Sequence, residues 1–438
     1  MAKPKNQKPP FALRALAAFA VTLAALFVLL LAAYALPGEP VRDHVYDSAV
    51  KIAGEGLYPE YLNFKLFQMD NYTDTIMLTE AASADEAPPL TAMMTNTAYN
   101  VDNFETLADD LQWYIVRDWA AGAQRTDAPA LVPFSYARYW HGYLIWLRPL
   151  LLITDITGVR VVQYLVLAAL FAAGAGLLRR RCGLRAAVWF AVSQLLVTAF
   201  WAPHQVQFFT CFAVAYAGCV WVLAKPRRSD DVCLTLLVLG VVTSFCDLLV
   251  TPVLTLGLPL VCWLLPPPHR LRAGTRQCGI VVGGSLTWGV GYLLCWASKW
   301  VLAGLVTGQN VIADALHQVG VRTAADSWHG MELTWSNILR FVYTILAGKH
   351  LFWPLVLAVV LLLALFAASI RDRQQLARAL PLGLCALMTP AWFIVLRTHS
   401  IQHGWFTWRA LGLTVFAGLA FLYYCCDVRQ IAKRLKRA

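Results

Sequence analysis

Long apolar runs separated by short polar segments dominate the chain. Runs of about 18 or more apolar residues indicate membrane-crossing helices, and here they predict about ten. Because the runs are continuous rather than alternating, they indicate helices and not the strands of a barrel. The expected fold class is therefore an all-α polytopic membrane protein. The expected spans are residues 11–36, 161–178, 184–200, 208–224, 232–249, 252–265, 278–305, 351–370, 380–396 and 406–424.

Two long polar segments interrupt these spans. Residues 37–158 separate the first and second spans, and residues 306–350 precede the eighth. The first segment is a large loop that we expect to contain interfacial helices. The rest of the chain divides into a tail with the first span (1–36), spans two to seven (159–305), and the last three spans with a basic tail (351–438).

Composition and charge support a membrane location and predict an orientation. The chain is 59% hydrophobic and only 14% charged, which is too apolar for an ordinary soluble domain, and its net charge is +11. Alternate loops carrying an excess of lysine and arginine face the cytoplasm. We therefore expect a multi-pass protein of the cell membrane, with both termini on the cytoplasmic side and the two long segments on the outer side. The charge requires no nucleic acid, and membrane lipid is the expected partner. The basic loops are residues 3–14, 179–185, 225–228, 270–276, 371–378 and 429–437.

Acidic residues in the first outer segment are candidates for catalysis. In the stretch "QMDNYTDTIMLTEA", Asp70 and Asp74 are four residues apart and share a face if both are helical. Paired carboxylates suit a general base, or oxygen ligands for Mg²⁺ or Mn²⁺. The alternative is that Asp70 caps the helix that begins with "TIMLTEAA". A cap needs only one of the two acids, so Asp74 calls for another explanation.

Cationic residues lie close to the expected membrane boundary. If "YARYWHGYLIWLRP" is one helix, Arg138, His141 and Arg148 fall on one side, opposite an aromatic side. Such an amphipathic helix would lie in the interface and could hold a phosphate. The alternative is an aromatic belt with arginines that only seat the protein.

Two further groups stand at the outer ends of later spans. Asp247 in "TSFCDLLVTP" lies at the outer end of the fifth span, where an acid usually faces a cavity or a partner. His399 and His403 in "LRTHSIQHGWFTWR" have the spacing of half a metal site, but no third ligand is evident nearby. Together with Arg409 they could instead bind a diphosphate; a polar interfacial turn is the alternative.

This layout resembles the GT-C class of membrane glycosyltransferases. The resemblance rests on a cytoplasmic N-terminus, about ten spans and a large first outer loop with acids and interfacial helices. It implies transfer of a sugar from a polyprenyl-phosphate carrier on the outer face. In that reading Asp70 and Asp74 match the family's acids. "YARYWHGYLIWLRP" matches its interfacial helix, and His399 and His403 match its late phosphate-side group.

The resemblance and the residues together favour a membrane glycosyltransferase that acts on an envelope acceptor. Two other classes stay open. A transporter or flippase of envelope precursors would show charged residues at the span centres, which here are nearly free of charge. A non-catalytic scaffold or sensor would use residues 37–158 as a receiving surface. The sequence leaves the sugar, the acceptor, the metal requirement and the oligomeric state open.

Overall fold

The computed structural model describes residues 9–63, 65–85, 87–100, 132–265, 274–323, 327–328, 331–338, 340 and 373–426. Within these ranges the chain is largely helical, with two short antiparallel strand pairs. The strand pairs are β1 (Thr97–Asn100) with β2 (Val132–Ser135), and β3 (Ser327–Trp328) with β4 (Met331–Glu332).

Seven helical segments in the described ranges are long and apolar enough to cross a membrane, which confirms the all-α polytopic class. Each overlaps one of the expected spans. They are Phe11–Tyr34 (α1), Ile156–Cys182 (α7), Val206–Ala224 (α9), Ser229–Cys246 (α10), Arg276–Thr307 within α12 (Gly274–Thr307), Arg373–Val395 and Gly404–Cys425.

The remaining expected spans leave the count of ten unconfirmed. Two of them form short helices, α8 (Leu184–Leu196) with 13 residues and α11 (Val253–Leu264) with 12. At 1.5 Å per residue such helices are only about 20 Å long, shorter than a hydrocarbon core of about 30 Å. The expected span at residues 351–370 lies outside the described residues.

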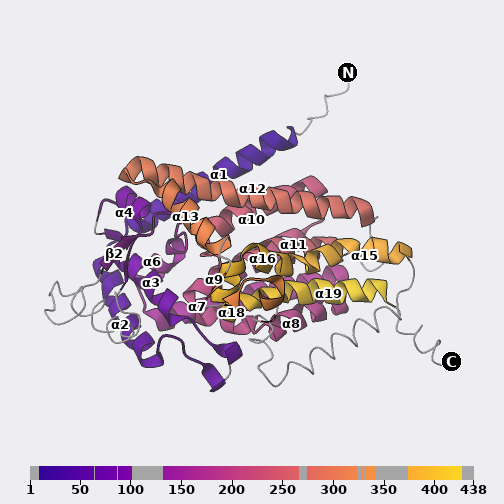
Figure 1. The fold of residues 1–438 in the computed structure, drawn as a ribbon, viewed down its shortest axis with the longest axis horizontal. Coiled ribbons are helices and arrows are strands. Elements are labelled where there is room, and N and C mark those ends of the chain that lie inside the picture. Colours follow the sequence, from indigo (N-terminus) through magenta and orange to yellow (C-terminus); the bar gives the residue numbers. More distant parts are fainter. Residues whose placement is uncertain are drawn as a thin grey trace.

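The helices form a bundle with a smaller cap at one end (Figure 1). The long helices, including α12 and α19 (Leu411–Cys425), run along the long axis of the molecule. One apolar core packs α7 to α9, α11 and α19 together, and a second joins the cap to α1 and to the adjoining ends of α10 and α12. The cap contains α2 (Glu39–Glu55), α3 (Asn71–Ala82), α4 (Pro89–Thr95), β1, β2 and α6 (Leu144–Leu151).

Local sequence signals set the ends of α7. Its N-cap Asp155 accepts a hydrogen bond of 2.8 Å from the backbone N–H of Thr157. At the other end, Gly183 adopts a φ of 94°, a conformation that favours glycine and turns the chain into α8. Arginines 179 to 181 occupy the last turn, where cations interact favourably with the helix dipole.

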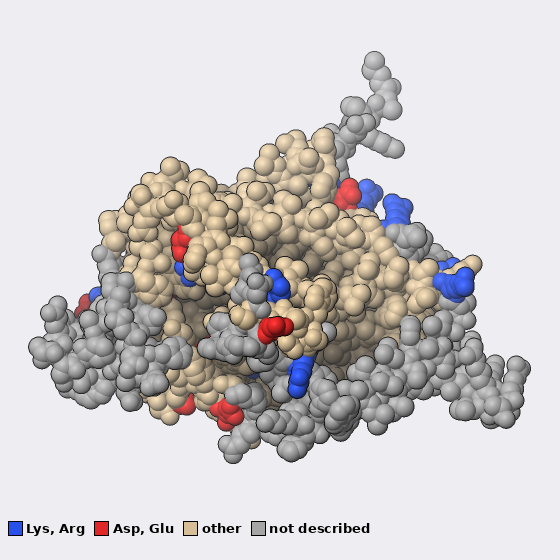
Figure 2. Space-filling view, viewed as in Figure 1, with Lys and Arg blue, Asp and Glu red and all other residues tan. Residues whose placement is uncertain are grey.

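Figure 2 shows several lysines and arginines at the end of the bundle away from the cap and others near the centre of this face, which is hollowed there. α7 and α9 end, and α10 and α12 begin, at the end of the bundle away from the cap. The cap and the basic end therefore lie at opposite ends of the bundle, as the alternating loop charges predict.

Close backbone approach holds α10 against α12. A Cβ atom at Gly291 would lie 2.4 Å from the carbonyl oxygen of Leu237, and one at Gly240 would lie 2.2 Å from that of Trp288. Both obstacles are backbone atoms, so the neighbour cannot yield by turning a side chain. Small residues at helix contacts in membranes permit such packing.

This contact predicts a difference between two glycines of the same helix. Gly291→Ala is expected to lower the midpoint of thermal unfolding in detergent, because overpacking costs about 1–3 kcal/mol. Gly289→Ala is the matched control, since no atom lies within 4 Å of a Cβ at that position. Alanine is also the better helix former, so the control should keep or raise the midpoint. Equal midpoints for the two variants would contradict the close approach.

Candidate functional site

Asp70 forms the N-cap of α3. Its carboxylate accepts hydrogen bonds from the backbone N–H of Thr73 at 3.1 Å and from the hydroxyl of Thr73 at 2.7 Å. The capping interpretation of Asp70 is thereby confirmed. The shared helical face expected for Asp70 and Asp74 is wrong, because Asp70 precedes the helix and Asp74 lies in its first turn.

Asp74 caps a different helix. Its side chain is fully buried, and its two oxygens accept hydrogen bonds of 3.1 Å from the backbone N–H groups of Val206 and Gln207 in the first turn of α9. Burial raises the pKa of Asp74 to about 7, although these hydrogen bonds act in the opposite direction. A carboxylate at a helix N-terminus satisfies free N–H groups and interacts favourably with the dipole. Asp74 therefore joins the cap to the bundle.

A polar network surrounds this junction. Arg160 donates two hydrogen bonds to Glu55, one of them 2.9 Å long, and one of 3.0 Å to the carbonyl of His204. Gln205 donates to Asn71 at 2.9 Å. These side chains satisfy one another's hydrogen-bonding groups. Among the described residues no three His, Cys, Asp or Glu side chains are placed to hold a metal ion. The Mg²⁺ or Mn²⁺ hypothesis therefore has no ligand set here beyond the two aspartates.

Arg138, His141 and Arg148 do not share a helix face, so the predicted amphipathic helix is wrong. The chain turns at His141, which has a φ of 54°, and α6 begins only at Leu144. The three residues fall on one side only if a regular helix continues through His141, and the turn at that residue breaks the helix. Arg138 and His141 both contact the rings of Tyr136 and Tyr139, whereas Arg148 is bonded to backbone carbonyls elsewhere.

Arg148 is fully buried and holds backbone segments together. Its guanidinium donates to the carbonyl of Ala33 at 2.8 Å, to that of Leu36 at 2.9 Å and to that of Ala81. These bonds join the end of α1 to α3 and α6. A guanidinium that donates to three carbonyls has a structural role, and the expectation that Arg148 binds phosphate stays an untested prediction.

His141 belongs to a buried group that sequence reasoning missed. Its Nδ1 lies 2.7 Å from Oε2 of Glu80, and the hydroxyl of Tyr143 donates to the same oxygen. The other oxygen of Glu80, Oε1, has no hydrogen-bond partner within the described part of the chain. Glu80 lines a cavity of about 190 Å³ together with Tyr34, Ser83 and residues of α4. A single glutamate in an apolar helical stretch gives little signal in sequence.

Lys299 is a second buried charge near the cap. Its ammonium donates to the carbonyl of Met93 and to Oδ1 of Asn96, both at 2.6 Å. Asn96 donates in turn to the hydroxyl of Tyr34 at 2.6 Å. Lys299 is the only charged residue in the apolar run at 278–305, and that exception could have identified it from the sequence.

Arg138 lies against α13 (Val311–Thr323). It contacts Asp314 at 3.2 Å, and its guanidinium stacks 4.5 Å from the ring of Tyr136. On the same helix, Arg322 donates to the hydroxyl of Tyr139 at 2.6 Å. Arg138 and Arg322 line a cavity of only about 20 Å³, too small to hold a lipid headgroup as it stands.

His399 lies in α17 (Arg397–Gln402) and His403 is the C-cap of that helix; their ring centroids are 4.7 Å apart and the rings are tilted against each other. Nε2 of His399 lies 2.9 Å from the carbonyl oxygen of Leu249. Burial, together with the charge of Arg322, lowers the pKa of His403 to about 4 and that of His399 well below its usual value. Both rings are therefore neutral near pH 7. The positive charge that attracts an anion to this site must therefore come from an arginine.

Among the described residues, Arg409 is the buried cation with the fewest hydrogen-bond partners. It is 1% exposed, and it donates one hydrogen bond of 3.2 Å, to the carbonyl of Leu66. Its Nε and Nη1 atoms have no partner among the described residues. The guanidinium lies 4.9 Å from the ring centroid of Phe208 in α9. Other buried polar groups of the same segment also lack partners within the described ranges: Thr398, His399 Nδ1, Ser400, Thr407 and Trp408.

Asp247 is a buried acid with one free oxygen. Its Oδ2 accepts from the backbone N–H of Val250 at 3.1 Å, whereas Oδ1 has no partner within the described residues. Burial raises the pKa of Asp247 to about 7. The acid interacts electrostatically with Cys211, which lies three residues after Phe208 on α9.

The fold and these buried charges define the class of the protein: an α-helical polytopic membrane protein with polar and ionisable groups enclosed at the cap end of its bundle. Comparisons with protein-family models, with curated proteins and with solved structures found no significant match.

Proposed function

We propose that the protein is a membrane glycosyltransferase that takes a sugar from a polyprenyl-phosphate carrier at the cap end of the bundle. The supporting observation is the guanidinium of Arg409, buried with two nitrogen atoms that have no partner among the described residues. A buried charge is costly unless it is paired and hydrogen-bonded. The planar guanidinium of Arg409 suits the oxygens of a phosphate, which accept charge-assisted hydrogen bonds from two adjacent N–H groups.

Asp247 is the acid best placed to act as general base in this proposal. Its Oδ1 is free among the described residues, and its pKa of about 7 lies near the operating pH, where proton transfer is most effective. The carboxylates of Asp70 and Asp74 instead accept hydrogen bonds from α3 and α9. We assign those two residues a positioning role, because Asp70 fixes the first turn of α3 and Asp74 fixes the first turn of α9, which Arg409 approaches through Phe208.

The proposed step is a displacement at the anomeric carbon of the carried sugar. The oxygen of an acceptor hydroxyl forms a bond to that carbon while the bond from the carbon to the phosphate oxygen breaks. The electron pair leaves with the phosphate, whose charge Arg409 binds. The hydroxyl proton passes to Asp247. A base in such a position contributes about 10²–10⁴ in rate.

The role of Asp247 predicts a characteristic pH dependence. Transfer of label from a polyprenyl-phosphate sugar to envelope polymer is expected to fall as the pH drops through about 7, because the carboxylate becomes protonated. Asp247→Asn is expected to lower transfer at least 10²-fold and to remove this pH dependence. Binding of the donor lipid should persist. A transporter would move the lipid without needing this base, so unchanged transport by the variant together with absent transfer by wild type would favour that alternative.

The same substitution is expected to stabilise the fold. The pKa of Asp247 is raised in the folded state, so burial of the charged form opposes folding increasingly as the pH rises from its usual value toward about 7. Asp247→Asn removes this cost, since an amide oxygen can still accept from Val250. The thermal midpoint in detergent should rise, and rise more at alkaline than at acid pH. A fall in the midpoint at all pH values would contradict this account.

A further inference from the structure

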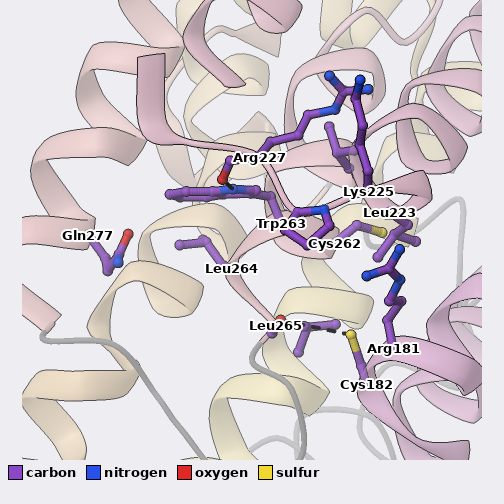
Figure 3. A pocket seen from close by; sticks show the side chains of 12 residues that line it. Arg181, Cys182, Leu223, Lys225, Arg227, Cys262, Trp263, Leu264, Leu265 and Gln277 are labelled. Carbon is purple, nitrogen blue, oxygen red and sulfur yellow. Dashed lines mark hydrogen bonds between the residues drawn. The ribbon is translucent and has the colours of Figure 1, made fainter. Parts of the chain in front are cut away.

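A basic pocket lies at the opposite end of the bundle from Arg409. Its cavity has a volume of about 190 Å³ and is bounded by the ends of α7, α9 and α11 and by the start of α12. Three cations line it, Arg181, Lys225 and Arg227, and no acidic residue is among its described lining. Figure 3 shows the side chains of Arg181 and Lys225 on one side of Trp263 and Gln277 on the other.

Hydrogen bonds to backbone carbonyls hold two of these cations in place without neutralising them. Arg181 donates to the carbonyl of Ala224 at 2.7 Å, and Arg227 donates to that of Trp221 at 3.0 Å. The guanidinium of Arg227 also lies 4.3 Å from the centroid of the Trp221 ring. None of the ion pairs formed within the described residues involves Arg181, Lys225 or Arg227. Their positive charge therefore remains available to an anion.

An unpartnered amide faces the same pocket. Gln277 is 8% exposed, and its Oε1 atom is buried without a hydrogen-bond partner within the described part of the chain. A carbonyl oxygen in that position accepts a hydrogen bond from a hydroxyl group. A ligand that carries both an anion and a hydroxyl satisfies the two sides of the pocket together.

An apolar groove continues from this pocket. A second cavity of about 660 Å³ shares Lys225 and Arg227 with the first, and it extends along α9 and α10 to Ala18 of α1. Its one acidic residue, Asp231, is paired with Arg14 at 2.6 Å. The three helices are candidate membrane spans, so the groove opens toward the hydrocarbon of the bilayer. Its lining includes Ala217, Gly218, Trp221, Leu234, Val238 and Leu239.

We propose that the two cavities form one binding site for an anionic glycerophospholipid. The phosphate lies among the three cations, a headgroup hydroxyl donates to Gln277, and an acyl chain occupies the groove. Basic residues at a membrane surface attract anionic lipids in this way. The site is independent of the proposed transferase chemistry, because it lies at the other end of the bundle and uses none of the same residues.

Full-length protein in nanodiscs tests this site. We expect phosphatidylglycerol, compared with phosphatidylcholine alone, to raise the thermal midpoint of wild type and to remain bound in native mass spectra. The double variant Lys225→Gln/Arg227→Gln should bind phosphatidylglycerol roughly 30-fold more weakly, since each such cation contributes about a fivefold factor. Arg185→Gln is the matched control, because it removes a charge from the same end but lines neither cavity.

A groove variant separates a lipid from a free phosphate. Ala217→Phe fills the groove from a position exposed to lipid, so it should weaken phosphatidylglycerol binding and leave the fold intact. Inorganic phosphate added to protein in detergent should not reproduce the stabilisation. Equal stabilisation by inorganic phosphate, an unaffected Ala217→Phe variant, or equal losses in Arg185→Gln and the double variant would each overturn the proposal.

Discussion

Replacing Arg409 by glutamine is expected to abolish binding of polyprenyl phosphate and, at the same time, to stabilise the unliganded protein. Loss of a buried charged partner weakens a complex by about 2–5 kcal/mol, which corresponds to a factor of about 30 to several thousand in affinity. In the free protein the guanidinium is 1% exposed and keeps two nitrogen atoms without partners among the described residues. Removing that charge relieves a desolvation cost.

The measurement combines lipid binding with thermal unfolding in detergent. Wild type should gain stability with polyprenyl phosphate, by about 2.7 kcal/mol at a concentration of 100 times Kd, and should gain none with the uncharged polyprenol. Arg409→Gln should begin with a higher midpoint and show no gain. Arg397→Gln is the control on the same segment, because this half-buried arginine donates to the carbonyl of Thr323. Wild-type affinity in Arg409→Gln would remove the main support for the proposed function.

A conservative variant refines the test. Arg409→Lys keeps the charge but presents a compact ammonium in place of a planar fork of N–H groups. We expect it to retain part of the affinity for polyprenyl phosphate, between wild type and Arg409→Gln. If lysine and glutamine weaken binding equally, recognition depends on the geometry of the guanidinium rather than on its charge alone.

The sequence predicted the features that depend on local patterns. Continuous apolar runs identify membrane helices, because the lipid requires every backbone polar group to be bonded within its own segment. The Asp70 cap was also readable, since the residue and the Thr73 N–H that it accepts from are three positions apart. Asp74 looked like a catalytic candidate because its partners, Val206 and Gln207, lie far along the chain. Sequence spacing contains no information about such a contact.

The prediction that Arg138, His141 and Arg148 share one helix face is wrong for a different physical reason. A regular helix was assumed across His141, but its φ of 54° interrupts the helix and sends Arg138 and Arg148 to separate places. Nothing in the residue types alone marks histidine as the residue that adopts this conformation. Arg409 is a binding candidate from the sequence, and that role stays a prediction; its burial and its missing partners among the described residues are visible only in three dimensions.

Arg148 and Arg409 show that burial alone does not separate a structural arginine from a binding one. Both are at most 1% exposed, and both lie near the cap end of the bundle. Arg148 donates to three carbonyls, whereas Arg409 donates to one and leaves two nitrogen atoms free among the described residues. A satisfied buried group stabilises the fold, and an unsatisfied one costs stability until a ligand supplies the partner. The two arginines should therefore respond to substitution with opposite signs.

Arg148→Leu is accordingly expected to destabilise the protein severely. The substitution leaves the carbonyls of Ala33, Leu36 and Ala81 without the donor that they share, and loss of one member of a buried charged network costs about 3–5 kcal/mol. Because these carbonyls lie at the end of α1 and in α3, the contact between the first membrane helix and the cap should weaken first. A loss of this size is a large fraction of the stability of a typical domain.

Thermal unfolding in detergent and limited proteolysis of the cap measure this effect. Arg148→Leu should lower the midpoint and expose α3 to protease, and Arg148→Lys should give an intermediate result, because one ammonium cannot reproduce the spacing of three guanidinium donors. Arg180→Leu, at an exposed position in the last turn of α7, is the control for loss of an arginine and should leave the midpoint nearly unchanged. If Arg148→Leu instead raises the midpoint, as predicted for Arg409→Gln, its carbonyl contacts contribute no net stability, and the contrast between the two arginines fails.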